Sequence, residues 1–497
     1  MLARLEQHAA PLPTAKPGRI RHLLIALPKG IAASGLARLP HAPVLKAALA
    51  RRRKKPEDLA TSPLSADAPG GALVSWVVHD PDQPAFERHT AMRKAVQALL
   101  AEHPREIVVA VFGTEAQRRK AAEAAVYAAW VNGARLPQRK KKAEGPVLAR
   151  VVLHGAELDA GGARLRALAE GNLLCRELTV LPPNELTPGA YRKRLEQLAE
   201  EHGWSHDEYD MARLRRLGAG AFVAVAQGSE PADAAIVHLI YRHRAARRMV
   251  ALVGKGICFD TGGHNLKTAR YMHGMHEDMN GSAVALSILL AATRAKLPVN
   301  IDCWLALAQN HLSPRAYRQN EVVKALNGTT IEIVHTDAEG RMVLADALTL
   351  AARGKPDLIV DFATLTGSMR VALGERYSGA FATSEELGRE VLAAGAASGE
   401  RVCLFPMDED YDAALDSAIA DVKQCTLEGE ADHILAARFL KRFTAGRPWI
   451  HMDLSASSCK GGLGAVASEV TGFGVGWGLA LLQSGLPQRR MRAARPG

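Results

Sequence analysis

The stretch from Val253 to Lys267 reads Val-Gly-Lys-Gly-Ile-Cys-Phe-Asp-Thr-Gly-Gly-His-Asn-Leu-Lys, and Asp278-Met279-Asn280-Gly281 follows it. An apolar run at residues 249–253 leads into this stretch and predicts a β-strand. Its four glycines let the backbone adopt positive φ and approach a ligand or metal closely. We therefore expect functional side chains after this strand, namely Lys255, Asp260, Lys267 and Asp278.

A second stretch has the same form and reads His335-Thr336-Asp337-Ala338-Glu339-Gly340-Arg341. It follows a strand-like apolar run at residues 331–334 and opens a helical pattern at residues 342–352. Asp337 and Glu339 can point the same way from an extended loop, and carboxylate oxygens are ligands of divalent cations. Two metals about 3.5–4 Å apart need bridging carboxylates and can hydrolyse amide or phosphate bonds. The two stretches thus predict a dinuclear metal site rather than solvated charges at strand ends.

Both stretches closely resemble the leucyl (cytosol) aminopeptidase family of dinuclear metallo-exopeptidases. The resemblance covers about residues 165–480 and continues in the segments 184–188 (Asn-Glu-Leu-Thr-Pro), 363–367 (Ala-Thr-Leu-Thr-Gly) and 471–475 (Thr-Gly-Phe-Gly-Val). It implies an enzyme that releases N-terminal amino acids from peptides. The charged residues that match the family's functional positions are Lys255, Asp260, Lys267, Asp278, Asp337, Glu339 and Arg341.

The resemblance also implies a role for each ligand of the two ions, which are Zn or Mn, with Mg at the exchangeable site. Asp260 and Glu339 bridge the ions, Lys255 and Asp278 complete one metal's shell, and Asp337 serves the other. An ammonium group has no lone pair, but two neighbouring dications depress its pKa and free the amine.

The remaining roles concern the peptide bond. The resemblance implies that Lys267 polarises the scissile carbonyl, an electrostatic role in acyl transfer. It implies that Arg341 holds a bicarbonate as general base, and the planar fork of arginine suits such an oxyanion. The residues implied to contact the substrate are Met275, Thr364, Leu365 and Gly367, with the neighbourhood of Ser455. For Met275 and Thr364 the alternatives are an ordinary core residue and a polar strand end.

Four departures from the family pattern leave the chemistry intact but leave the leucine preference open. His335 stands where the family usually has Asn, His276 where it usually has Lys, Asn280 where it has a small residue, and Ser455-Ala456 where it has Ala-Gly. We expect His335 to have a pKa below the free value of about 6.5 and to shape the acid limb of activity. The alternative is a neutral, hydrogen-bonded core residue. His264, His273 and His276 are expected near the site but outside the ligand set.

Composition places the chain among globular proteins of two or three domains, with 497 residues, 48% hydrophobic and 23% charged. No apolar run approaches the roughly 20 residues that span a bilayer, and the N-terminus shows no secretory signal. The six cysteines lack CxxC pairing, as expected for reduced thiols. We therefore expect a cytoplasmic protein without membrane contact, and the resemblance adds a homohexamer of two stacked trimers.

The formal charge of +11 is concentrated in three basic runs, at residues 51–55, 139–142 and 489–495. Such runs can bind phosphate backbones, but no aromatic stacking residues interleave them, so we interpret them as solvated loops and tails. A nucleic-acid-binding protein on the same scaffold is the less favoured alternative. A two-metal phosphoesterase is another, although it explains neither a lysine ligand nor the segment 363–367.

The periodicity predicts an α/β fold with two domains and a linker. A smaller N-terminal α/β domain, residues 1–160, carries no ligand cluster, and we assign it a regulatory or oligomerisation role. It begins with a mobile segment at residues 1–20 and contains a long loop at residues 51–71. A helix within residues 161–183 leads into the larger catalytic domain, residues 184–497, where a mixed sheet is flanked by helices. Predicted strands there include residues 222–225, 235–241, 301–307 and 358–362.

Overall fold

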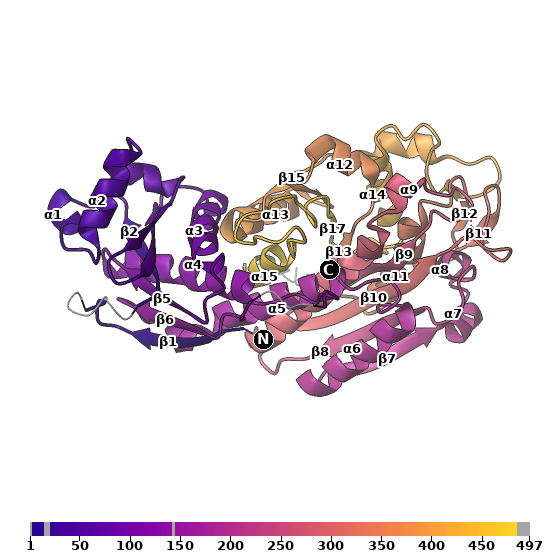
Figure 1. Ribbon diagram of the computed structural model, residues 1–497. Helices are drawn as coiled ribbons and strands as arrows, with labels where there is room; N and C mark the ends of the chain where they lie inside the picture. Colours follow the sequence, from indigo (N-terminus) through magenta and orange to yellow (C-terminus); the bar gives the residue numbers. More distant parts are fainter. Residues whose placement is uncertain (1, 14–19, 142–144, 485–497) are drawn as a thin grey trace, which may run out of the picture.

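A computed structural model describes residues 2–13, 20–141 and 145–484 of the chain. The described chain forms a smaller N-terminal part and a larger C-terminal part, joined by helix α5 (Ala163–Thr179), as Figure 1 shows. Each part is built around its own sheet, with helices packed on the faces. The predicted α/β fold, with a smaller first part and a mixed sheet in the second, is confirmed.

The N-terminal sheet has six strands in the order β1-β6-β5-β2-β4-β3. All neighbours are parallel except β3 and β4. The strands are β1 (Arg4–His8), β2 (His22–Pro28), β3 (Leu64–Ala68), β4 (Ala72–His79), β5 (Glu106–Val111) and β6 (Arg150–His154), and the long helices are α2 (Ala42–Arg51), α3 (Ala85–Leu100) and α4 (Glu115–Gly133). Two expectations were wrong here. The segment expected to be mobile contains β1, which pairs with β6, and the segment expected to be a loop contains β3.

The C-terminal sheet has eight strands in the order β15-β14-β17-β13-β9-β10-β8-β7. The four central strands β17, β13, β9 and β10 are mutually parallel. Strand β14 pairs antiparallel with β17, β8 with β10 and β7 with β8, whereas β15 pairs parallel with β14. The strands are β7 (Ser205–Asp210), β8 (Ala235–Tyr241), β9 (Met249–Asp260), β10 (Asn300–Asn310), β13 (Leu358–Ala363), β14 (Ser378–Ala382), β15 (Val402–Leu404) and β17 (Trp449–Asp453).

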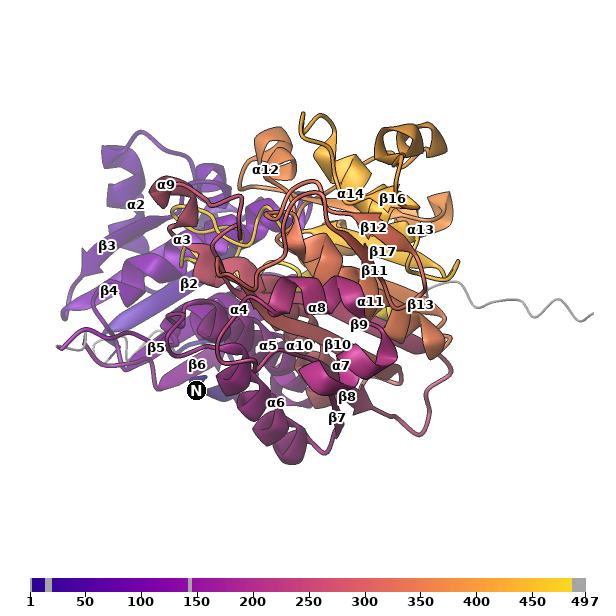
Figure 2. The same ribbon diagram turned by 90° about the vertical axis from the view of Figure 1, so that its right-hand side faces the viewer.

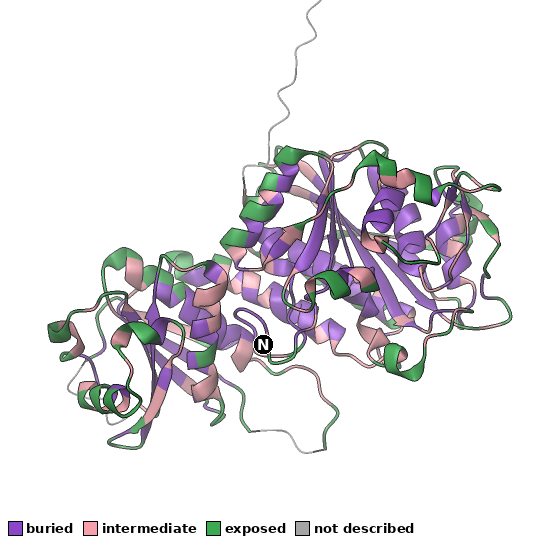
Figure 3. Ribbon diagram, turned by 90° about the horizontal axis from the view of Figure 1, so that it is seen from above, coloured by how far each residue is buried: buried purple, intermediate pink, exposed green. Residues whose placement is uncertain are grey.

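Helices cover both faces of this sheet, and their apolar sides form two separate cores. One core contains α10 (Asn280–Arg294), α6 (Pro188–His202), α13 (Glu385–Ser398) and α15 (Val475–Gln483) together with α5; the other contains α11 (Glu339–Arg353), α8 (Gly220–Ala226) and α14 (Asp432–Lys441). The central strands are therefore buried on both sides, as Figure 3 shows, and they read as continuous apolar runs. Ligand sites in such sheets lie at the carboxyl ends of the strands.

The predicted strand at residues 222–225 was wrong, because this segment belongs to helix α8. A short apolar run does not distinguish a strand from a buried helix by its periodicity. A neighbouring helix holds the first turn of α8, because the Phe222 N–H donates to Oδ2 of Asp346 on α11 at 2.8 Å. A small third sheet lies beside it, formed by β11 (Val322–Lys324), β12 (Thr330–Glu332) and β16 (Val422–Lys423).

The two parts of the chain are in close contact along α5 and the segment that follows β17. Arg93 on α3 donates to the carbonyl oxygen of Gly461 at 2.7 Å. Asn132 on α4 donates to the carbonyl oxygen of Ala465 at 2.8 Å, and Ala465 and Val466 are members of the N-terminal core. In the described part of the chain, no helix combines the length and apolar character of a membrane span. All six cysteines are free, as expected.

Candidate active site

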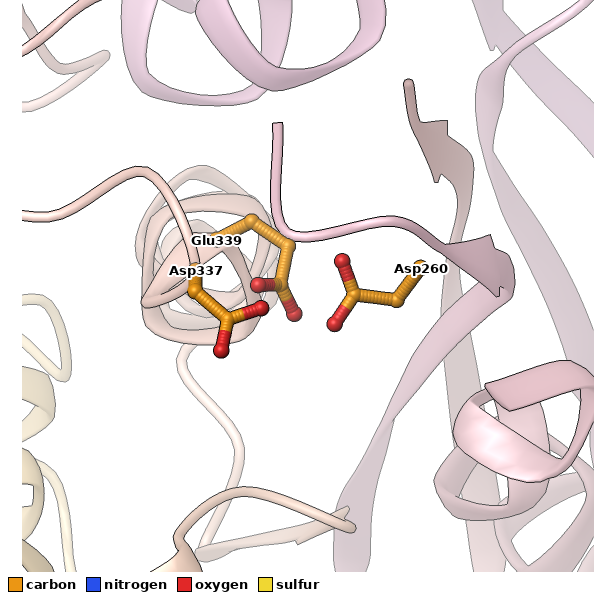
Figure 4. A group of neighbouring side chains, drawn as sticks. All are labelled: Asp260, Asp337 and Glu339. Atoms are coloured by element: carbon orange, nitrogen blue, oxygen red, sulfur yellow. The ribbon is translucent and has the colours of Figure 1, made fainter. Parts of the chain in front are cut away.

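Three carboxylates from two separate segments converge beyond the carboxyl end of β9. Asp260 is the last residue of β9, Asp337 lies in the loop before α11, and Glu339 is the first residue of α11. Carboxylate oxygens of all three lie within 4.8 Å of one another. Figure 4 shows the three side chains directed toward a common point. The two motifs far apart in the sequence thus form one cluster.

Two lysines pair with this cluster, and one of them, Lys255, connects it to Asp278, which lies in the 3-10 helix η4 (Met275–Met279). The Nζ atom of Lys255 lies 2.8 Å from Oδ1 of Asp278 and 3.0 Å from Oε1 of Glu339. The Nζ atom of Lys267 lies 2.8 Å from Oδ2 of Asp260 and also pairs with Asp337. The structure therefore brings together Lys267 and all five residues predicted as metal ligands.

The ionisation of this cluster departs from ordinary behaviour because it is buried and densely charged. Burial raises the pKa of Asp278 to about 8, assisted by the neighbouring charges of Glu339 and Asp260. The same causes raise the pKa of Asp337 to about 7. Burial opposes the charge of Lys255, but the surrounding carboxylates outweigh it and raise its pKa. Four carboxylates faced by two ammonium groups favour the entry of further cations.

The donor set fits divalent metal ions. Oδ2 of Asp278 and Oε2 of Glu339 are buried and have no hydrogen-bond partner in the described chain. Buried polar atoms are rarely left unpaired without a functional reason. Oxygen-rich sites suit Mg or Mn, and carboxylates also bind Zn. The residues present therefore suit the pair of ions that the sequence predicts.

Asn310 is a supporting residue that the sequence analysis missed. It ends β10 and lies opposite Asp260 in the parallel ladder. Its Nδ2 donates to Oδ1 of Asp260 at 2.8 Å, and the Gly262 N–H donates to the same oxygen at 2.9 Å. These two donors orient the carboxylate, with Oδ2 on the lysine side. Only the register of β9 and β10 reveals the pairing, so no motif could have found it.

The glycines of the first motif act in two different ways. Gly262 and Gly263 have φ values of 86° and 63°, in the left-handed region that favours glycine. Gly254 instead permits close packing, since a Cβ there would lie 2.4 Å from Cα of Ser282. Gly340 has the same role beside the site, because a Cβ there would lie 2.7 Å from Nζ of Lys255.

The segment after β13 lies next to the carboxylates and presents the predicted substrate-contacting residues. The Thr364 hydroxyl donates to Oδ1 of Asp278 at 2.7 Å, and the Lys255 ammonium donates to the carbonyl oxygen of Thr364 at 2.9 Å. Leu365 is half-buried and Gly367, which begins α12 (Gly367–Leu373), is exposed. Met275 is half-buried in η4, close in sequence to Asp278, and not a fully buried core residue.

The histidines near the site have different environments. His264 and His273 are exposed, and His276 is half-buried. Nδ1 of half-buried His335 accepts a hydrogen bond from the Asp337 N–H at 3.2 Å. Burial and then the charge of Lys267 lower the pKa of His335, in the direction predicted from the sequence. Its effect on the acid limb of activity stays a prediction.

Arg341 lies on the first turn of α11 and is almost completely buried, at 2% exposure. Its Nη2 is 2.7 Å from Oδ1 of Asp432, the first residue of α14. Its Nη1 donates to the carbonyl oxygen of Gln424 at 3.0 Å. Asp432 is a further residue that the sequence analysis did not identify.

The fold and the site define an α/β protein with a candidate centre for divalent metal ions, built from two loops that follow parallel strands. The family model described as the cytosol aminopeptidase family, catalytic domain, matches residues 173–477. The chain belongs to this family, and its class is that of the metal-dependent aminopeptidases.

Individual relatives agree with this assignment. A probable cytosol aminopeptidase of Acidovorax ebreus (strain TPSY) is 38% identical over 467 residues, which cover 91% of this chain and 90% of that protein. One from Stutzerimonas stutzeri (strain A1501) is 40% identical over 331 residues, covering 65% of this chain and 66% of that protein. Among solved structures, a tomato leucine aminopeptidase mutant has a TM-score of 0.82 at 25% identity and covers 97% of both chains. The bottromycin maturation enzyme BotP in complex with Mn has a TM-score of 0.78 at 32% identity, covering 93% of this chain and 98% of that one.

Proposed function

We propose that this chain releases N-terminal amino acids from peptides by a two-metal mechanism. The observation that carries the proposal is the convergence of Asp260, Asp337 and Glu339 within 4.8 Å, beside the lysine-linked Asp278. Asp260 and Glu339 would bridge the ions, with Lys255, Asp278 and Asp337 completing the shells. When bound, Zn or Mn ions, with Mg at the exchangeable position, supply an activated water and an electrophile for the carbonyl.

Lys267 is proposed to polarise the scissile carbonyl. Burial opposes its charge, but Asp260, Glu339 and Asp337 outweigh it and raise the pKa, so the side chain stays an ammonium group. It is 13% exposed, whereas Lys255 is 4% exposed and lies deeper among the carboxylates. A fixed positive charge at the open side of the cluster suits the oxygen that becomes negative during amide hydrolysis.

The proposed substrate groove is formed by the segment after β13. The carbonyl of Leu365 and the N–H of Gly367 would hold the peptide backbone, and Met275 and Thr364 would line the pocket for the first side chain. Thr364 is fixed by its bond to Asp278, so the groove and the metal ligands are positioned together. This connection supports the placement of the N-terminal residue directly over the carboxylates.

Arg341 is proposed to hold a bicarbonate that would act as the general base. A bidentate oxyanion needs two parallel N–H donors of one guanidinium. Nη2 and Nη1 of Arg341 each have one partner, Asp432 and Gln424, and each nitrogen carries a second N–H, while Nε is buried without a partner in the described chain. These remaining N–H groups are the donors that would hold the anion.

We further propose that the enzyme works in the cytoplasm as a homohexamer, with the N-terminal part serving assembly or regulation. Six free cysteines support a reducing compartment. The family resemblance is the support for the hexamer.

Hydrolysis assays test the proposed function. The purified chain is incubated with a panel of aminoacyl p-nitroanilides in the presence of Zn, Mn or Mg. We expect metal-dependent release of nitroaniline, no cleavage of N-acetylated analogues, and no hydrolysis of bis(p-nitrophenyl) phosphate. Cleavage of the phosphate diester without cleavage of any anilide would assign the site to a phosphoesterase instead.

A further inference from the structure

A cavity of about 380 Å³ lies between the two parts of the chain, and none of the proposed metal ligands lines it. Its N-terminal wall comes from the end of β4 and from helices α3 and α4, and its C-terminal wall from the end of α13 and from α15. Figure 1 shows α3 and α4 facing α13 and α15. The walls meet where a Cβ at Gly399, which caps α13, would lie 2.9 Å from Nδ1 of His89 on α3. The volume is within the range of about 300–1,000 Å³ that is typical of small-molecule sites.

Helix α5 forms the wall that joins the two sides. It packs closely on the catalytic core, because a Cβ at Gly171 would lie 2.8 Å from the Ser287 carbonyl oxygen on α10. Figure 2 shows α5 beside α10. Apolar side chains of α5 and of the segment that follows β17 line the cavity, namely Leu165, Leu168, Leu463 and Phe473. The cavity therefore offers an apolar surface as well as polar groups.

Two buried polar side chains of the N-terminal wall lack hydrogen-bond partners among the described residues. His79 is the last residue of β4 and is 5% exposed, and its Nδ1 is unpaired. Tyr127 on α4 is 8% exposed, and its hydroxyl forms no hydrogen bond with the described chain. Buried polar atoms are rarely left unpaired without a functional reason. Strand β4 is parallel to β2, and ligands in such sheets bind at the carboxyl ends of the strands.

The same wall carries two positive charges that no carboxylate of the described chain neutralises. Lys120 on α4 forms no ion pair, and Arg88 on α3 donates only to backbone carbonyl oxygens. Burial, and then the charges of Arg88 and Lys120, lower the pKa of His79 to about 4, so its imidazole is neutral. Glu123, the acidic residue on this wall, lies 3.7 Å from Arg119. The two free cations suit a carboxylate group of a ligand.

The C-terminal wall carries the opposite charge. Oε2 of Glu400 accepts hydrogen bonds from the N–H groups of Gly474 and Trp477, both at 2.8 Å. No basic side chain of the described residues pairs with Glu400, and burial raises its pKa to about 7. An ammonium group of a ligand is the partner that this carboxylate lacks. The charge of Glu400 also acts on Tyr127, which places the two walls around one space.

We propose that this cavity binds a free α-amino acid with an apolar side chain. Its carboxylate pairs with Arg88 and Lys120, its ammonium group pairs with Glu400, and its side chain packs on the α5 wall. The ligand chemistry follows from the cavity alone, whereas its meaning rests on the proposed function, because such an amino acid is the product of that reaction. Released amino acid thus binds at a second site, where it strengthens the contact between the two parts of the chain.

Calorimetric titration of the metal-free full-length chain tests the ligand class. We expect saturable binding of one L-leucine per chain. Glycine lacks the apolar side chain, leucinamide lacks the carboxylate and 4-methylpentanoate lacks the amine, so each should bind about 10-fold more weakly or less. Leucine should also raise the melting temperature with saturation. Equal affinity for 4-methylpentanoate, or binding of inorganic phosphate without binding of leucine, would overturn the proposal in favour of a simple anion site.

Variants test the location. Lys120→Ala, Tyr127→Phe and Glu400→Gln should each weaken leucine binding, by about 10-fold for the two charged residues. Lys94→Ala, at an exposed lysine of α3 outside the cavity, serves as the matched control and should bind leucine normally. Because Lys120 is also exposed, its variant provides the measurement if a buried variant does not fold.

Two outcomes separate this inference from the proposed function. Leucine binding that is lost in Lys267→Ala but unchanged in the cavity variants would place the ligand at the carboxylate cluster and overturn the inference. A chain that cleaves aminoacyl anilides but binds no leucine without metal would overturn it as well. A chain that binds leucine in the cavity but cleaves no anilide would support the inference and contradict the proposed function alone.

Discussion

The carboxylate of Asp453, the last residue of β17, accepts hydrogen bonds from the segment that follows β13. The Leu365 N–H lies 3.0 Å from Oδ1, and the Thr366 hydroxyl lies 2.7 Å from Oδ2. Asp453 is buried, so these bonds are shielded from water. The end of β17 therefore positions the segment that follows β13, its parallel neighbour in the sheet.

Removal of this support should impair substrate binding more than metal binding. In Asp453→Ala, the Leu365 amide and the Thr366 hydroxyl lose a charged acceptor, an interaction worth about 1.5–3 kcal/mol. We expect kcat/KM to fall about 10- to 100-fold, mainly through KM, with metal content retained. Thr366→Val should give a smaller loss. Steady-state kinetics and metal analysis check this, and an unchanged KM in Asp453→Ala would exclude a positioning role.

Loss of a bridging carboxylate should abolish turnover. Asp260→Ala or Glu339→Ala removes a ligand shared by both proposed ions, so both activity and bound metal should decrease to background. Asp302→Ala, a change at a buried carboxylate on β10 that pairs with His238 and Arg242, serves as the control and should retain metal. Elemental analysis after dialysis reports the metal content. Full occupancy with near-normal rates in either ligand variant would refute the assignment.

Lys267→Ala should separate catalysis from metal binding. The ammonium group is proposed to act on the carbonyl, so kcat should fall by about 10²–10³ with the metal retained. Lys267→Arg keeps the charge and should be less affected. Pre-steady-state and steady-state rates on the same substrate provide the comparison. Equal losses of metal and rate in Lys267→Ala would instead indicate a role in assembling the site.

Glu400 provides a test by pH. Its carboxylate lines a cavity of about 380 Å³ between the two parts of the chain and accepts hydrogen bonds from the N–H groups of Gly474 and Trp477 at 2.8 Å. Burial raises its pKa from 4.5 to about 7, so the native state binds more protons than the unfolded state between these values. The contribution of protonated Glu400 to the free energy of unfolding is fully present below pH 4.5 and is lost as the pH rises through 7. The free energy of unfolding changes by at most about 1.4 kcal/mol per pH unit for this group.

Urea unfolding of wild type and Glu400→Gln at pH 5 and pH 7.5 measures this effect. Because the glutamine does not titrate, the free energy of unfolding of the wild type relative to the variant should be larger at pH 5. A pH-independent difference would show that the carboxylate stays ionised in the folded protein throughout this range.

Site residues that lie in local sequence motifs could be predicted from the sequence, whereas contacts that depend on strand register could not. Lys255, Asp260, Asp337 and Glu339 follow apolar runs within glycine-containing motifs, so their convergence could be predicted. The contacts of Asn310 and Asp453 could not, because strand register places Asn310 opposite Asp260 and brings Asp453 to the segment after β13. Helix α8 was mistaken for a strand because its seven residues are too short to show a helical period.

Asp432 was missed for a related reason. It lies far from both motifs in the sequence, and an acidic residue in the first turn of a helix has an ordinary explanation in the helix dipole. Its contact with Arg341 arises only when α11 and α14 pack in the same core.

The contacts between the two parts of the chain bear on what constitutes a unit of folding. Arg93 and Asn132 supply donors to the carbonyls of Gly461 and Ala465, and the N-terminal core includes Ala465 and Val466. A fragment that begins at residue 161 would lose these donors and expose this apolar surface to water. The boundary near residue 160 thus separates two sheets that do not unfold independently. The intact chain should lose both sheets in a single unfolding transition.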